Sequence, residues 1–72
     1  MKLLSVLGEV CPVPLLRTQE ALAAMDPGEV LVVETDFARS VRNIIDWCRA
    51  RGMAYTVEEC GSGIWRVTIR KG

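Results

Sequence analysis

The residues best suited to chemistry are Cys11-Pro12-Val13-Pro14, a thiol followed by two ring-constrained residues. Proline is favoured in the first turn of a helix, where its missing N–H has no intrahelical partner and its φ is already helical. The residue before each proline is pushed toward extended geometry. The pattern therefore places Cys11 just before the start of a helix, on a stiff stretch of backbone.

The start of a helix is a favourable place for a sulfur anion, because the peptide dipoles stabilise a nearby anion by about 0.3–1 kcal/mol. That stabilisation lowers the pKa of a thiol and raises its nucleophilic thiolate fraction. Pro12 and Pro14 have no N–H, so Leu15 and Leu16 are the predicted amide donors. The alternative is a buried structural cysteine, since free cysteine is among the most buried residue types.

Other site chemistries find little support, because the chain has no histidine. Cys-His and Ser-His-Asp catalysis need an imidazole base, so both are excluded. The acidic residues are scattered and the cysteines lack zinc-type spacing, so no metal or other cofactor is expected. Gly61-Ser62-Gly63 lacks the following helix that a phosphate loop needs. What remains is one thiol that takes a group, such as sulfur, from an activated donor and passes it on.

The other two cysteines have different settings. Cys48 falls on the apolar stripe of a predicted helix and is expected in the core. Cys60 adjoins a turn and is expected to be exposed, with a resolving thiol as its alternative role. Three cysteines without a CxxC pair do not indicate a disulfide framework. The N-terminal apolar run is too brief for a signal peptide or a membrane span, which predicts a cytoplasmic protein without membrane insertion.

Length and charge set further limits. The 72 residues predict a single domain over residues 1–72. Nine basic residues balance nine acidic ones, which argues against direct nucleic-acid binding. Arg66, Arg70 and Lys71 form a local basic cluster, interpreted as the solvated face of an edge strand, with a docking patch as the alternative.

The first half of the chain predicts two strands separated by a helix. Residues 3–7 form a short strand, and residues 13–25 have apolar residues at helical spacing. Asp26-Pro27-Gly28 ends this helix. Residues 29–35 contain a continuous, β-branched apolar run, which indicates a central strand buried on both faces.

The second half predicts a helix followed by a hairpin. Asp36 is the expected N-cap of the helix and Gly52 its C-terminal cap. Strands follow at residues 53–59 and 64–70, and the second alternates between polar and apolar side chains. The order β-α-β-α-β-β predicts an α+β fold: a two-layer α/β sandwich, with both helices on one face of a four-stranded mixed sheet and an antiparallel final pair.

With these residues in hand, the chain resembles the TusA/SirA family of small sulfur-carrier proteins over nearly its whole length. The resemblance includes Gly8, three residues before the thiol, and Cys11-Pro12-Val13-Pro14-Leu15-Leu16. It continues through Ala21-Leu22, Pro27-Gly28-Glu29-Val30-Leu31, Ile44, Trp47, Gly52, Arg66 and Ile69-Arg70-Lys71.

The resemblance implies the same two-layer fold and a persulfide on Cys11. The sulfur would come from a desulfurase or rhodanese-like donor and go to an acceptor protein; some members work with permeases that import thiosulfate. The chain has Ser5, Asn43-Ile44-Ile45 and Met53 where many members have an acidic residue, Asp-Ile-Pro and His. These departures suit a thiosulfate-linked subgroup rather than the transfer-RNA thiolation branch.

Three functions stay open from the sequence. The first is a sulfurtransferase-type persulfide carrier, with a monomer as the default state. The second is a non-enzymatic regulatory or docking partner of a membrane transporter for sulfur compounds. The third is RNA binding, which the zero net charge weighs against.

Overall fold

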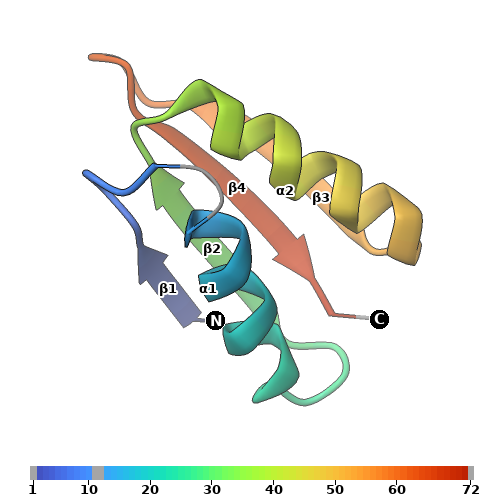
Figure 1. The fold of residues 1–72 in the computed structure, drawn as a ribbon. Coiled ribbons are helices and arrows are strands. Elements are labelled where there is room, and N and C mark those ends of the chain that lie inside the picture. Colours follow the sequence, from blue (N-terminus) through green and yellow to red (C-terminus); the bar gives the residue numbers. More distant parts are fainter. Residues whose placement is uncertain (1, 11–12, 72) are drawn as a thin grey trace.

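The computed structural model describes residues 2–10 and 13–71, and its elements follow the predicted β-α-β-α-β-β order (Figure 1). The elements are β1 (Lys2–Ser5), α1 (Val13–Ala23), β2 (Val30–Thr35), α2 (Ala38–Arg51), β3 (Ala54–Glu59) and β4 (Trp65–Arg70). The largest differences from the predicted bounds are at β1 and α1, which end two residues earlier than expected, at Ser5 and Ala23.

The strands form one four-stranded sheet in the order β1-β2-β4-β3. β1 is parallel to β2, whereas β4 is antiparallel to both β2 and β3. Both helices lie on the same side of this sheet (Figure 1), which confirms the predicted two-layer sandwich. β4 is internal, so the prediction of an edge strand for the basic cluster was wrong. Arg66 and Arg70 are exposed because they project from the uncovered face of an internal strand.

The burial of β2 differs from what the sequence predicted. It is central, as expected, but only one of its faces is fully buried: Leu31 and Val33 are buried, while Val30 and Val32 are half-buried. The continuous apolar run suggested two covered faces, yet both helices pack on the same face, and none of the described residues forms a layer on the other.

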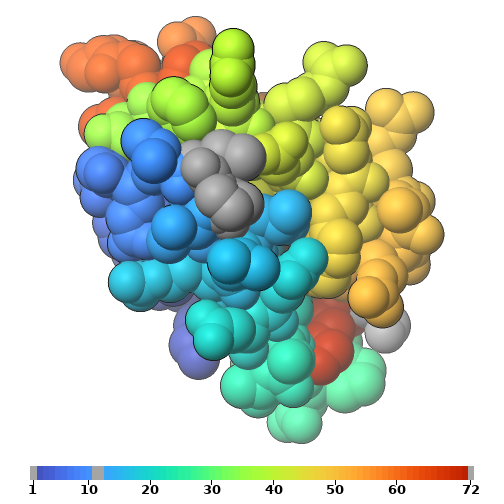
Figure 2. Space-filling model, in the orientation of Figure 1, coloured from blue at the N-terminus to red at the C-terminus, as the bar shows by residue number. Residues whose placement is uncertain are grey.

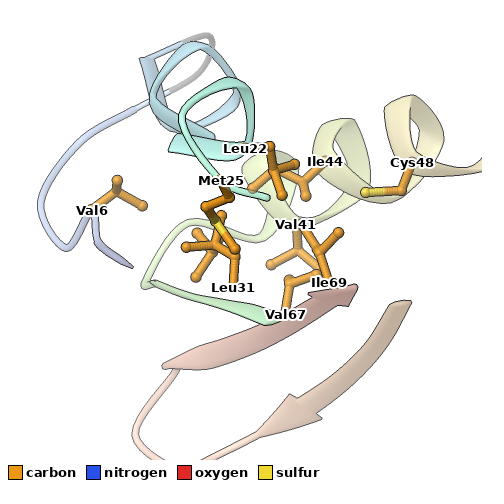
Figure 3. Packing of buried hydrophobic residues seen from close by; sticks show 10 residues of the cluster. Val6, Leu22, Met25, Leu31, Val41, Ile44, Cys48, Val67 and Ile69 are labelled. Carbon is orange, nitrogen blue, oxygen red and sulfur yellow. The ribbon is translucent and has the colours of Figure 1, made fainter. Parts of the chain in front are cut away.

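The core lies between the helices and the sheet (Figure 3). Side chains from the end of α1, from the inner face of α2 and from the middle strands point toward one another there. Its buried hydrophobic members are Val6, Leu22, Met25, Leu31, Val33, Val41, Ile44, Cys48, Val67 and Ile69. Burying a side chain of this size contributes about 1.5–3 kcal/mol, so this layer fixes how α1 lies on the sheet.

Of the two caps predicted for α2, the C-terminal one is confirmed and the N-terminal one was wrong. Gly52 adopts the left-handed conformation, φ 72°, and its N–H donates to the Arg49 carbonyl at 3.2 Å, which confirms it as the C-terminal cap. The predicted Asp36 N-cap was wrong, because Phe37 occupies that position and makes no side-chain cap hydrogen bond. The Asp36 carboxylate instead accepts a hydrogen bond from a distant part of the chain, the Gly8 N–H.

Candidate functional site

The predicted nucleophile Cys11 and its neighbour Pro12 lie outside the described residues, but the segments on either side of them are described. Residues 6–10 and the first turn of α1 lie at the end of the sheet where the parallel strands β1 and β2 have their carboxyl ends (Figure 1). The two segments adjoin on one face of the molecule, as the blue and light-blue surfaces of Figure 2 show. Binding sites in α/β folds commonly lie beyond the carboxyl ends of parallel strands.

Residues 6–10 are fastened to the end of β2 by backbone and carboxylate groups. The Val6 N–H donates to the Glu34 carbonyl at 2.8 Å, and the Glu9 N–H donates to the Val6 carbonyl at 3.2 Å. The Gly8 N–H faces both carboxylate oxygens of Asp36, at 3.1 and 3.2 Å. Gly8 has a φ of 79°, a conformation that other L-residues adopt only at a cost. The loop that leads to Cys11 therefore starts from a fixed position.

The Gly8–Asp36 hydrogen bond was missed by the sequence reasoning. A signal for it does exist: Gly8 follows the first strand, Asp36 follows the second, and the two strands are parallel. Because the carboxyl ends of parallel strands meet at one edge, a glycine after one strand lies near an acid after the other.

The same loop is also joined to α1. The Val13 N–H, at the start of α1, donates to the Val10 carbonyl at 3.0 Å. Arg17 Nη2 lies 3.3 Å from Glu9 Oε2 in an ion pair, with the two side chains 51% and 27% exposed. Ion pairs with this exposure contribute about 0–1 kcal/mol, so the pair orients the loop more than it stabilises the fold.

The described start of α1 narrows the predicted amide donors. The Val13 N–H already has an acceptor and Pro14 has no N–H, so Leu15 carries the next amide of the helix. Leu16 is the fourth helical residue, where an amide ordinarily donates within the helix. There is no acidic residue in this first turn. Pro14 is buried, Leu15 half-buried and Leu16 exposed; their supporting roles stay predictions.

The opposite end of α1 is closed by a lysine. Lys71 Nζ donates to the carbonyls of Leu22 and Met25, at 2.6 Å in each case. The Leu22 carbonyl also accepts from the Met25 N–H, at 3.1 Å. A cation at this end of the helix neutralises the negative end of its dipole. The interpretation of Lys71 as a solvated surface residue was therefore wrong, because its ammonium group is partly buried against α1.

Beside Lys71, the ends of α1 and α2 border an open cleft of about 540 Å³. Its lining includes Gln19, Trp47, Arg51, Met53 and Lys71. The guanidinium carbon of Arg51 lies 5.5 Å from the centroid of the Trp47 ring, within the range of a cation–π interaction. Trp47 also packs against the core.

The other two cysteines lie as predicted, and both are free thiols. Cys48 is 0% exposed, and its burial raises its pKa to about 11. A buried thiol with a raised pKa is chemically inert. Cys60 is exposed just after β3, with its Sγ 3.8 Å from Glu58 Oε1.

Arg66, on β4, contributes positive charge beside Cys60. Its pKa is raised by a side-chain hydrogen bond to Glu34, at 3.2 Å, and by the charges of Cys60 and Glu34. β3 and β1 are opposite edges of the sheet, so Cys60 and the loop after β1 belong to different sides of the same end. The resolving role of Cys60 stays a prediction.

Neither a metal-binding cluster nor a membrane-spanning helix is found among the described residues. Within residues 2–10 and 13–71, no three His, Cys, Asp or Glu side chains gather closely enough to hold a metal ion. In the same part of the chain, neither helix is long and apolar enough to cross a membrane.

Comparisons with known proteins agree on one family. The family model described as sulfurtransferase TusA matches residues 2–71. The chain is 36% identical to "Putative sulfur carrier protein TsuB" of Escherichia coli, over 99% of this chain and 96% of the relative. It is 40% identical to a "Putative sulfur carrier protein" of Thermotoga maritima, over 96% of this chain and 89% of the relative.

A solved structure carries the same fold. The crystal structure of a SirA-like protein from Desulfitobacterium hafniense superposes with a TM-score of 0.91 and 33% sequence identity, covering 100% of this chain and 99% of that one. The loop fixed at the carboxyl end of β1, the helix that begins behind it and these matches lead to one conclusion. The chain belongs to the TusA family of sulfur carriers.

Proposed function

We propose that the protein accepts sulfane sulfur as a persulfide on Cys11 and relays it to an acceptor protein. The observation that carries the proposal is the two-sided fastening of the loop before Cys11. Asp36 fixes its Gly8, and the Val10–Val13 hydrogen bond leads directly into α1. The segments on both sides of Cys11 are therefore anchored, which suits a carrier that must meet successive partners.

The transfer is an exchange between sulfur atoms without net oxidation. The Cys11 thiolate attacks the outer sulfur of a donor persulfide, R–S–SH, so that a new S–S bond forms at Cys11. The S–S bond of the donor breaks, its thiolate RS⁻ leaves, and the proton stays with the transferred sulfur. With thiosulfate, the same attack releases sulfite and leaves an ionised persulfide on Cys11. The acceptor thiolate repeats the exchange and restores the free Cys11 thiolate.

The start of α1 supports the anionic forms of this cycle. Its first turn has no acidic residue, so no carboxylate competes there for the positive end of the helix dipole. We assign Leu15 the main supporting amide and Leu16 a secondary one. Pro12 and Pro14 remove donors and stiffen the approach.

The donor in this scheme is a desulfurase or rhodanese-like protein, or a permease that handles thiosulfate, and the acceptor is a protein thiol. The family membership supports exchange with a donor and an acceptor. Because each turnover restores the thiol, the protein works as a sulfurtransferase-type carrier. A thiol that must stay reduced between transfers suits the cytoplasm.

Intact-mass spectrometry tests the proposal. The chain is incubated with a cysteine desulfurase and cysteine, with thiosulfate-loaded rhodanese, or with thiosulfate alone. We expect the wild type and Cys60→Ser to gain the mass of one sulfur atom, and Cys11→Ser to gain none. Dithiothreitol should remove the added mass. A wild type that gains no sulfur from any donor, or a Cys11→Ser variant that gains as much as the wild type, would refute the proposal.

A further inference from the structure

We propose that four exposed apolar side chains form the surface on which a protein donor of persulfide sulfur docks. This inference rests on the proposed role of Cys11. The four, here called the apolar collar, are Leu7, Val10, Val13 and Leu16, which are 42%, 58%, 39% and 52% exposed. All of them fall within ten positions of sequence that also contain Cys11.

The geometry of α1 turns half of the collar outward. Val13 and Leu16 are three positions apart and share one face of the helix. The residues that α1 buries are Pro14, Thr18 and Leu22, on its other face. Leu16 therefore lies outside the buried core, and the exposed half of its surface is available to a partner.

The rest of the collar lies on the loop before the helix. The hydrogen bond from the Val13 N–H to the Val10 carbonyl, at 3.0 Å, holds Val10 next to the helix start. Val10 precedes Cys11 directly in the sequence, and only Pro12 separates Cys11 from Val13. A protein that exchanges sulfur with Cys11 therefore comes close to these two members of the collar.

The charges of this segment indicate what kind of protein fits. Between residues 7 and 17 the only charged residues are Glu9 and Arg17, and they neutralise each other at 3.3 Å. The segment itself has no net charge to steer an acidic or basic partner, and the Asp36 carboxylate that lies against it accepts a hydrogen bond from the Gly8 N–H. Covering the exposed apolar side chains of the segment is favourable, because apolar surface is removed from water. The matching donor is a persulfide-bearing sulfurtransferase whose cysteine lies in an entrance lined by apolar side chains.

The chain offers a matched control elsewhere. Leu3 is 64% exposed on β1, paired with Val32 on the face of the sheet that neither helix covers. Val57 is 40% exposed on the edge strand β3. Substitutions at Leu3 and Val57 remove comparable exposed apolar surface without touching the collar.

The test separates docking from the reactivity of the thiol. Sulfur transfer to the chain is timed by rapid-quench mass spectrometry from two donors, thiosulfate-loaded rhodanese and glutathione persulfide. The variants are Leu16→Ser, the double variant Val13→Ser with Leu16→Ser, and the controls Leu3→Ser and Val57→Ser. Sedimentation of wild type and variants measures the oligomeric state in parallel.

We expect the double variant to slow transfer from rhodanese by about tenfold or more, as the loss of central apolar contacts does at interfaces. Transfer from glutathione persulfide should stay within about twofold, since a small donor needs little docking surface and both substitutions keep the backbone N–H groups assigned to the site. The controls should behave as the wild type. Raising the salt from low to high concentration should change the rhodanese rate less than the double variant does.

Four results would overturn the inference. The double variant and the wild type could accept sulfur from rhodanese equally fast. Both donors could slow equally, which would assign the residues to the thiol itself. Leu3→Ser could slow transfer as much as Leu16→Ser. Wild-type dimers that Leu16→Ser dissociates would show that a second copy covers the collar. If the wild type accepts sulfur from neither donor, the proposed function fails first, and this inference fails with it.

Discussion

The two ends of α1 are treated in opposite ways. Near its C-terminal end, the ammonium group of Lys71 donates hydrogen bonds to the carbonyls of Leu22 and Met25, at 2.6 Å in each case. At its N-terminal end the first turn has no acidic residue. One pole of the helix dipole is thus neutralised within the fold, and the other is available to an external or reactive anion.

The cysteines follow the same division. Cys48, toward the C-terminal end of α2, is sealed in the core with a pKa raised to about 11. Cys60 is exposed at the end of the sheet where the loop after β1 lies. The comparison teaches that this small fold places the lysine cap of α1 and its inert thiol away from the end that we propose to be reactive.

The largest expected effect concerns Cys48 at high pH. Its pKa rises from 9.0 to about 11 because burial disfavours the thiolate, so the folded state holds the proton more tightly than the unfolded state. This contribution to the free energy of unfolding is complete below pH 9 and is lost as the pH rises through about 11. The loss should reach about 1.4 kcal/mol per pH unit in that window.

Urea denaturation of wild type and Cys48→Ala, followed from pH 8 to about 11, measures this effect. The alanine variant will be less stable at pH 8 because it leaves a small cavity, but its profile should fall less steeply above pH 9. Cys60→Ser, which removes an exposed thiol, should keep the wild-type slope. If the stability of Cys48→Ala and of the wild type fell equally steeply with pH, the raised pKa of the buried Cys48 thiol would be contradicted.

The second effect opens the closed end of α1. Lys71→Met keeps the length of the side chain but removes the hydrogen bonds to the carbonyl of Leu22, in α1, and to that of Met25, just beyond it. We expect the free energy of unfolding to fall by about 2 kcal/mol, because two charged hydrogen bonds are lost and the carbonyls face an apolar group. Arg70→Met is the matched control, since its neighbouring cation is exposed on the uncovered face and should change stability little. Comparable losses in both variants would show that net charge, and not the cap, is responsible.

The third and smallest effect loosens the other end. Asp36→Asn keeps the shape of the side chain but removes the charge that accepts the Gly8 N–H. We expect a loss of about 1 kcal/mol in stability, together with slower loading of sulfur, because the loop before Cys11 is held less firmly. Asp46→Asn is the control, because its ion pair with Arg42, at 3.8 Å, is exposed on α2. Loading rates that are equal in the two variants would remove Asp36 from the positioning of the loop.

The fold could be predicted because its signals are local. The turn at Asp26-Pro27-Gly28, the Gly52 cap and the alternation of β4 each act within a few residues, and they gave the correct element order. The burial of Cys48 followed from the stripe of a single helix in the same way.

The errors share a different physical origin. Asp36 was assigned to its own helix, but its partner Gly8 lies 28 positions away. Lys71 was assigned to solvent, but it donates to carbonyls at the end of α1 that lie 46 and 49 positions earlier. β2 was assigned two covered faces, since an apolar run does not tell on which side of the sheet two helices pack. In each of these three errors, the outcome depended on which residues contact one another in the folded protein. A single sequence gives little information about such long-range contacts.

The most direct test of the central claim is the pH dependence of the alkylation of Cys11 by iodoacetamide, in a Cys60→Ser chain where Cys48 is buried. Peptide mapping identifies the labelled thiol. If the unneutralised start of α1 holds an accessible sulfur anion, alkylation of the folded protein will have a midpoint below the ordinary thiol pKa of about 8.5. A midpoint at or above that value, or a Cys11 that reacts only after denaturation, would contradict the account.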